Sequence, residues 1–160
     1  MYLPDNDSQI LRLSNNFYKV YPISSYREIL SKQGRSYNCL LFQTHYNYFI
    51  CVPYRTDILH DYAYKFQSSI RSQAHQSGLD YSKMVIIQDM DYVESSNAII
   101  DQDEYNETMI NLNIIKGEAL NYLESYIKHK NGETVLSSQE FRRKYRYSPL
   151  QYFHNILGLQ

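Results

Sequence analysis

The sequence predicts an α+β protein in which a small antiparallel sheet or barrel is packed against helices. Two observations predict this class. The first half of the chain holds short apolar or alternating runs bounded by turn residues, whereas apolar residues recur at helical spacing in the second half. Neither a repeat nor a linker divides the 160 residues, so we expect one domain over residues 1–160.

The N-terminal part is expected to hold an arm, a strand and a short helix. Residues 1–15 are mostly polar and irregular, which is typical of a loose arm. Residues 17–21 alternate in polarity and end at Pro22, which predicts a strand. A pair of serines precedes residues 26–30 and resembles a helix start, and Gly34 ends that helix.

Residues 38–44 and 48–52 form the clearest hairpin, because two apolar runs flank a short polar turn. With a two-residue turn at positions 46–47, residue i faces residue 93 − i. Cys39 and Cys51 then point to opposite faces of the sheet and cannot form a disulfide.

More strands are expected before the chain becomes helical. Residues 62–66 begin either a strand or a helix, and we favour the strand because aromatic rings at every second position suit a sheet. A polar loop is expected at residues 68–78, a buried strand at residues 84–87 and a short strand at residues 97–100.

The rest of the chain predicts helices with recognisable ends. Asp101 and Glu104 form a capping box before apolar residues at helical spacing, and this long helix is expected to end at residues 131–132. Ser137 precedes a short helix, and Ser148 with the proline after it precedes a last one that ends at a glycine.

Composition excludes several classes of protein. Two cysteines are too few for a disulfide scaffold or a zinc site, and five glycines without a phosphate-binding loop argue against a nucleotide cofactor. We therefore expect no metal and no cofactor. The sequence shows neither a signal peptide nor an apolar run of membrane-spanning length, so a cytoplasmic location without a membrane partner is expected.

Charge is segregated along the chain, although the net charge is only −1. Residues 84–107 hold seven carboxylates and no Lys or Arg, which leaves about +6 on the remainder. The acidic run lacks the spacing of a calcium loop, so a solvated loop and a helix N-terminus are favoured there. The basic remainder and the 18 tyrosines are compatible with nucleic-acid binding or with a protein interface.

The first candidate site follows the second hairpin strand. Arg55, Thr56 and His60 supply a permanent cation, a hydroxyl and a titratable ring, and metal-free cleavage of a phosphodiester uses these groups. Lys65 adds a further positive charge. The alternative is that Arg55 and His60 are solvated residues at the end of a strand.

The second candidate site, Arg35 and Tyr37, immediately precedes the hairpin. The start of one antiparallel strand neighbours the end of the next, so Tyr37 is expected beside residue 56. Tyr37 is thus a candidate to orient the substrate or to handle a proton. The alternative is a plain turn with a ring packed over the edge of the sheet.

The third candidate is a basic cluster of Arg142, Arg143, Lys144 and Arg146, which lies among aromatic residues. Interleaved cations and rings suit an RNA backbone with unstacked bases. The alternative is a solvated helix face whose rings pack on the core.

Six short motifs occur in a recognisable order from about residue 15 onward. They are Phe17-Tyr18, Arg35-x-Tyr37 leading into Leu40-Leu41, Pro53-Tyr54-Arg55-Thr56-x-Ile58-x-His60, residues 78–83 (Gly-Leu-Asp-Tyr-Ser-Lys) with Val85-Ile86, Ile99-Ile100-Asp101, and residues 152–158 (Tyr-Phe-His-Asn-Ile-Leu-Gly). In these motifs the chain resembles the RNA-cleaving toxins of type III toxin–antitoxin systems, the ToxN, CptN and TenpN group with AbiQ as a more distant member. It is most similar to the CptN and TenpN branch.

The resemblance implies a twisted antiparallel barrel of the MazF/Kid type with helices around it. It also implies a metal-independent endoribonuclease that is inhibited by a small, repeat-encoded pseudoknot RNA and is held with it in a closed toxin–RNA assembly. Action of such toxins on cellular RNA arrests growth and can abort phage infection. In the ToxN branch, consecutive hydroxyl residues and then a lysine follow the proline. Here Arg55 replaces the first hydroxyl, Thr56 keeps the second and the lysine is missing, so Arg55, Lys65 and Arg35 are the candidates for the catalytic cation.

We therefore predict a catalytic site of Arg55, Thr56, His60 and Tyr37, with cleavage by 2′-hydroxyl attack that leaves a 2′,3′-cyclic phosphate. RNA contacts are predicted for the other singled-out residues: Arg35, Lys65, Tyr18, Arg142, Arg143, Lys144 and Arg146. A non-catalytic RNA-binding module of similar barrel architecture is the main alternative. A tyrosine-rich protein-interaction domain is a third.

Overall fold

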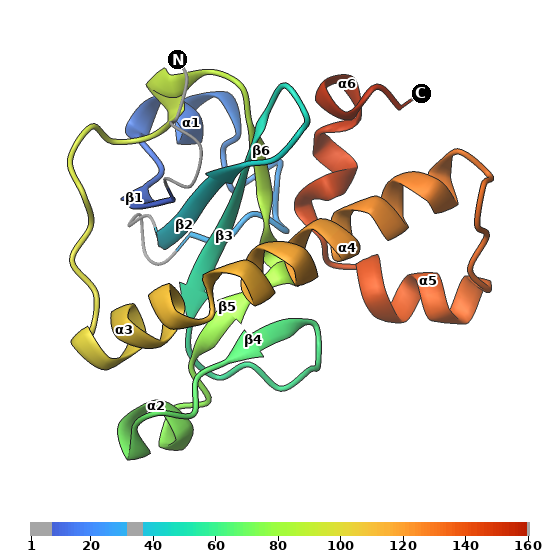
Figure 1. Cartoon of the computed structure of the whole chain (residues 1–160). Helices are drawn as coiled ribbons and strands as arrows, with labels where there is room; N and C mark the ends of the chain where they lie inside the picture. Colours follow the sequence, from blue (N-terminus) through green and yellow to red (C-terminus); the bar gives the residue numbers. More distant parts are fainter. Residues whose placement is uncertain (1–7, 32–36, 160) are drawn as a thin grey trace.

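The computed structural model describes residues 8–31 and 37–159, and it shows one antiparallel sheet with helices packed around it (Figure 1). The strands are β1 (Gln9–Arg12), β2 (Asn38–Gln43), β3 (Phe49–Arg55), β4 (Ala63–Lys65), β5 (Gly78–Asp80) and β6 (Val85–Ile87). The helices are α1 (Asn15–Val20), α2 (Ile70–Ala74), α3 (Gln102–Ile110), α4 (Leu112–Lys130), α5 (Ser138–Tyr145) and α6 (His154–Leu157). Three 3₁₀ turns complete the fold: η1 (Tyr81–Lys83), η2 (Met90–Tyr92) and η3 (Pro149–Tyr152). The expected α+β class is confirmed.

The sheet is open, and the expected barrel is not found. Its strand order is β1-β2-β3-β5-β4, and β6 pairs with β3 beside β5. A barrel would require the two ends of this order to pair, and β1 and β4 do not pair within the described residues. Helices α3 and α4 instead run across one face of the sheet (Figure 1).

Strand β3 is the centre of the sheet. Its first six residues are buried, because it has neighbours on both edges and layers on both faces. Cys51 is its last residue paired with β6, and Tyr54 is its first residue paired with β5. Pro53, which has no N–H to donate, lies where β3 passes from one partner to the other.

The hairpin of β2 and β3 is confirmed, but its register differs from the expected one by one residue. Cys39 faces Pro53 and Gln43 faces Phe49, because the connection is longer than two residues. A shift by one residue moves side chains to the other face. Cys51 faces Leu41, so it shares a face with Cys39, and both remain free thiols. The expectation that the cysteines point to opposite faces is wrong.

Two N-terminal elements differ from the sequence-based expectation. Residues 9–12 form β1 and pair with β2, where the loose arm was expected; residues 1–7 lie outside the described part. Residues 15–20 form α1, where a strand was expected. Ser14 caps this helix, and the rings of Phe17 and Tyr21, one turn apart, pack with their centroids 4.9 Å from each other. The alternating residues are therefore compatible with a helix as well as with a strand.

Two other short elements are absent from the described chain. Residues 26–30 form turns and bends, not the expected helix. Residues 97–100 form no strand. One backbone hydrogen bond, from the N–H of Ala98 to the carbonyl of Ile10, holds them beside β1. The predicted stop at Gly34 lies outside the described residues.

The strands predicted at residues 62–66 and 84–87 are confirmed as β4 and β6. The expected loop at residues 68–78 is broken by α2, which Ser69 caps by accepting the amide of Ser72. Its last residue, Gly78, already belongs to β5.

The helix starts predicted for the second half of the chain are confirmed. Asp101, Ser137 and Ser148 each accept a backbone amide at the start of α3, α5 and η3. The predicted long helix is interrupted at Asn111, whose side-chain amide donates to the carbonyl of Glu107 at 2.9 Å, and α4 starts anew after it. No helix within residues 8–31 or 37–159 combines the length and the apolar character that a membrane crossing needs.

Candidate active site and nucleic-acid interface

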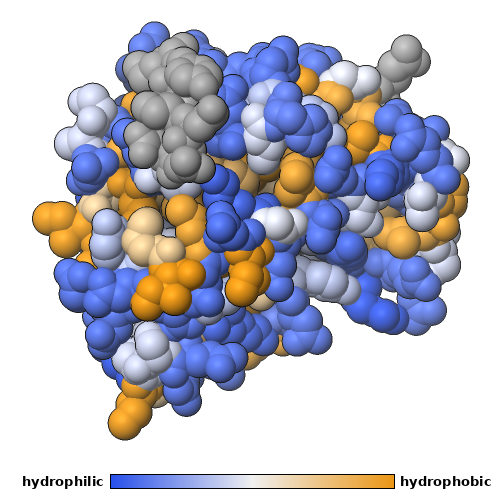
Figure 2. Space-filling view, viewed as in Figure 1, coloured by the Kyte–Doolittle hydropathy of each residue, from blue (hydrophilic) through white to orange (hydrophobic). Residues whose placement is uncertain are grey.

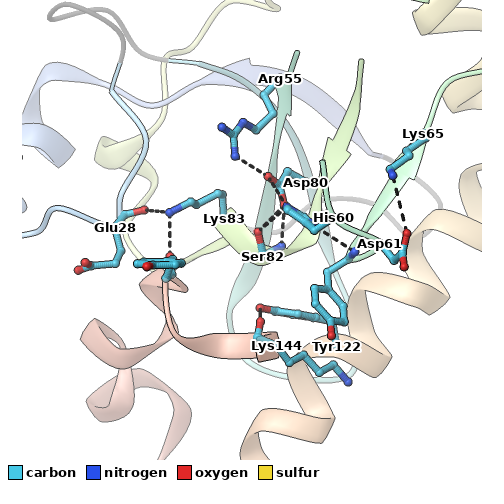
Figure 3. A network of polar contacts seen from close by, with 12 residues as sticks. Glu28, Arg55, His60, Asp61, Lys65, Asp80, Ser82, Lys83, Tyr122 and Lys144 are labelled. Carbon is cyan, nitrogen blue, oxygen red and sulfur yellow. Dashed lines mark hydrogen bonds and ion pairs between the residues drawn. The ribbon is translucent and has the colours of Figure 1, made fainter. Parts of the chain in front are cut away.

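Strands β3 and β5 bring Arg55 and Asp80 to one face of the sheet. Arg55 pairs with Gly78, which lies two residues before Asp80, so both side chains project to the same side. Arg55 Nη1 donates to Asp80 Oδ2 at 2.9 Å. The Asp80 side chain is fully buried, whereas 28% of the Arg55 side chain is exposed. A buried carboxylate is therefore paired with a cation that still reaches solvent (Figure 3).

Glycine is required between these strands. A Cβ atom on Gly78 would lie 2.3 Å from the carbonyl oxygen of Tyr64 on β4, which no side chain can tolerate. The close approach of β4 and β5 thus depends on this one residue, and so does the position of Asp80 two residues later.

Asp80 is the hub of a polar cluster that also contains Ser82 and His60. The amide and the hydroxyl of Ser82 both donate to Asp80 Oδ1, at 3.0 and 2.6 Å. His60 Nε2 lies 3.3 Å from Asp80 Oδ2. Four groups from three segments of the chain therefore orient around one buried carboxylate, and we name Arg55, His60, Asp80 and Ser82 the Asp80 cluster (Figure 3).

The hydrogen bonds of His60 define its tautomer. Its Nδ1 accepts the backbone N–H of Tyr62 at 3.0 Å, so the proton of the neutral ring is on Nε2. That N–H is directed at Asp80 and at the Ser82 hydroxyl, 3.2 Å away. The arrangement is not a Ser-His-Asp triad, in which serine and aspartate would contact opposite nitrogens. His60 is a hydrogen-bond donor in this geometry, and its side chain is 33% exposed.

Lys83 connects the Asp80 cluster to two distant segments. Its Nζ donates to the carbonyl of Glu28 at 3.1 Å and to that of Tyr147 at 2.8 Å. Burial lowers the pKa of Lys83 below its ordinary value. The negative charge of Asp80 raises this pKa and the positive charge of Arg55 lowers it, but burial has the largest effect. The segment after α5 is therefore fixed beside the cluster.

The other predicted catalytic residues, Thr56 and Tyr37, form no hydrogen bond to the Asp80 cluster within the described residues. Thr56 is exposed, and within the described residues it forms no hydrogen bond with the cluster. Tyr37 is half-buried and lines a small cavity together with Tyr18 and Lys83. Tyr18 donates its hydroxyl to the Leu30 carbonyl, and burial raises the pKa of Tyr18 above its ordinary value, so this ring belongs to the interior.

The remaining predicted cations differ in their surroundings. Lys65 forms an exposed pair with Asp61 at 3.8 Å and does not reach Asp80. Arg35 lies outside the described residues. Lys144 Nζ lies 5.7 Å from the ring centroid of Tyr122 and 5.4 Å from that of Tyr145. Burial lowers the pKa of Lys144 below its ordinary value.

The three arginines of the basic cluster share a different surface. Arg142, Arg143 and Arg146 line an open hollow of about 510 Å³, which the exposed ring of Tyr147 also borders. The basic cluster is thus divided, because Lys144 packs on tyrosine rings while the arginines face this hollow.

Sequence reasoning placed no site at Asp80, Ser82 or Lys83. Residues 78–83 stood out only as a motif of the resemblance, and nothing local connects them with Arg55. Their role depends on the pairing of β3 with β5, which joins segments more than 20 residues apart. A glycine directly before an alternating Leu-Asp pair was the available signal, because it permits close approach of strands.

Within the described ranges, His, Cys, Asp and Glu side chains do not gather in a group of three that could hold a metal ion. Comparisons with models of protein families, with curated proteins and with solved structures found no match to this chain.

Proposed function

We propose that this chain is a metal-independent endoribonuclease and acts as the toxin of a type III toxin–antitoxin system. One observation carries the proposal: Arg55 and His60 are both partly exposed, and both are oriented by the buried carboxylate of Asp80. Arg55 uses one of its five N–H groups for Asp80, so others remain to bind a phosphate.

The reaction requires stabilisation of charge on phosphorus. The 2′-oxygen of the RNA gives its proton to solvent and bonds to phosphorus, the bond to the 5′-oxygen breaks, and that oxygen takes a proton from solvent. Extra negative charge develops on the non-bridging oxygens in between. The N–H groups of Arg55 that Asp80 leaves free are donors for this charge. The Nε2–H of His60 is engaged by Asp80 and Ser82, so His60 helps to orient the cluster, and Asp80 acts as a positioning residue because it is buried.

The proposed partner is a small pseudoknot antitoxin RNA, and cellular RNAs are the proposed substrates. The hollow beside Arg142, Arg143 and Arg146 supports an RNA partner, because guanidinium groups bind phosphates bidentately. A closed toxin–RNA assembly is part of this proposal.

Expression in bacteria without the antitoxin RNA tests the proposal. We expect growth arrest by the intact chain and relief of that arrest by Arg55→Ala or His60→Ala. Arg71→Ala is the matched control, since Arg71 pairs with Asp101 away from the cluster and its loss should leave toxicity unchanged. Arrest by a folded Arg55→Ala, His60→Ala double variant contradicts the site. RNA binding without arrest or cleavage favours the non-catalytic RNA-binding module.

A further inference from the structure

The surface of α5 gathers positive charge, because three cations follow its one acidic residue, Glu140. Arg142 and Arg146 are one helical turn apart, and Arg143 lies between them, so the three line the same hollow. Within the described residues, none of the three guanidinium groups forms an ion pair with a carboxylate. Like charges this close repel one another, and a bound anion removes that repulsion.

An aromatic ring stands at the edge of this hollow. The side chain of Tyr147 is 60% exposed, and the Arg146 guanidinium carbon lies 5.0 Å from the centre of its ring. The backbone of Tyr147 is held in place, because Lys83 Nζ donates to its carbonyl at 2.8 Å. The ring is therefore presented to solvent from an anchored segment.

We propose that this hollow is a subsite for single-stranded RNA, in which the three arginines bind phosphates and an unpaired base stacks on Tyr147. Arginine matches the geometry of phosphate oxygens, and a tyrosine ring stacks on a base of any identity. A base in a duplex is already stacked on both faces, so the ring selects unpaired strands. The hollow, of about 510 Å³, suits contact with one or two nucleotides.

The position of the hollow relates it to the candidate active site. Lys83 directly follows Ser82 of the Asp80 cluster in the chain, and its Nζ donates to the carbonyl of Tyr147 at 2.8 Å. The Tyr147 border of the hollow is thus tied to the segment that carries Ser82. This assignment rests on the proposed function for the class of nucleic acid, but its test requires no cleavage.

Fluorescence anisotropy with a short, unstructured, labelled RNA oligonucleotide measures the subsite. All proteins carry His60→Ala, so that the probe stays intact. We expect Arg142→Ala, Arg146→Ala to weaken binding at least about tenfold and to flatten the dependence of log affinity on log salt, because phosphate contacts are lost. Tyr147→Ala is expected to weaken binding about tenfold without changing that salt dependence, and Tyr147→Phe to bind as tightly as the parent.

Matched controls and competitors complete the test. Arg71→Ala removes an exposed arginine far from α5 and should bind as the parent does. Unchanged affinity in the double arginine variant or in Tyr147→Ala overturns the subsite, as does a duplex RNA or an acidic peptide that competes as well as the single strand. If the subsite binds RNA as expected while the chain with His60 intact cleaves none, the subsite stands and the proposed activity fails. If the intact chain cleaves RNA but the variants bind the probe as tightly as the parent, the proposed activity stands and the subsite fails.

Discussion

Replacement of Asp80 by Asn tests how the cluster is held together. Asp80 accepts from Arg55, His60 and Ser82 with two oxygens, and its side chain is fully buried. Asparagine keeps the shape but replaces one acceptor with an NH₂ group. That group must then face a donor, and the charge of Arg55 loses its counterion.

The expected cost follows from burial. Removal of one partner from a fully buried ion pair costs about 3–5 kcal/mol, because the other charge is left uncompensated. Arg55 is 28% exposed, so solvent reduces this penalty. We expect Asp80→Asn to lower the free energy of unfolding by about 2 kcal/mol.

Urea unfolding at neutral pH measures this change. Asp61→Asn is the matched control, since Asp61 is fully exposed in its pair with Lys65 and its replacement should have no measurable effect. Combining Asp80→Asn with Arg55→Met should cost less than the sum of the two single changes. An Asp80→Asn variant within about 0.5 kcal/mol of wild type would refute the central role of this carboxylate.

Two further predictions concern backbone packing and pH. Gly78→Ala should lower the free energy of unfolding by about 1–3 kcal/mol, because its Cβ would meet the Tyr64 carbonyl at 2.3 Å. Gly117→Ala is the control in helix α4, where a Cβ atom meets no other atom within 4 Å, and it should raise the free energy of unfolding by about 0.5–1 kcal/mol. Equal urea midpoints for the two variants contradict the steric argument. Burial opposes ionisation of Glu107, but hydrogen bonds from Ser68, Tyr64 and Gln67 outweigh it and lower the pKa of Glu107 below its ordinary value. Glu107 therefore stabilises the fold above its ordinary pKa, and this contribution is lost as pH falls through the lower, folded pKa. Wild type should exceed Glu107→Gln in unfolding free energy at pH 7, and thermal unfolding should show the gap closing in acid; a constant gap contradicts the assignment.

The parts of the fold that the sequence predicted are those with local signals. The helix caps at Asp101, Ser137 and Ser148 need only a side-chain oxygen and an amide a few residues away. The strand β6 was predictable from its continuous apolar run. Residues 17–21 were ambiguous, because five residues satisfy either period.

The parts that the sequence did not predict depend on pairing across the sheet. The hairpin register depends on the length of its loop. A shift of one residue places Cys39 and Cys51 on the same face of the sheet, where opposite faces were expected. Arg55 and His60 were named as candidates, but Asp80 joins them only through the pairing of β3 with β5. Whether a sheet closes is likewise set by long-range contacts, which is why the barrel remained an expectation.

The surface facing the viewer in Figure 2 is largely hydrophilic, with hydrophobic side chains gathered over α3 and the start of α4. Ile110, Ile114 and Tyr105 on these helices are exposed, at 83%, 56% and 43%. Neither α3 nor α4 contributes a residue to the Asp80 cluster, so variants of these residues should leave RNA cleavage unchanged.

The most direct test of the proposed activity is incubation of purified protein with RNA in excess EDTA, followed by analysis of the new 3′ ends. We expect cleavage that persists in EDTA and leaves 2′,3′-cyclic phosphates, and its loss in Arg55→Ala. Cleavage that stops with EDTA, products with 3′-hydroxyl ends, or full activity in Arg55→Ala would contradict the account.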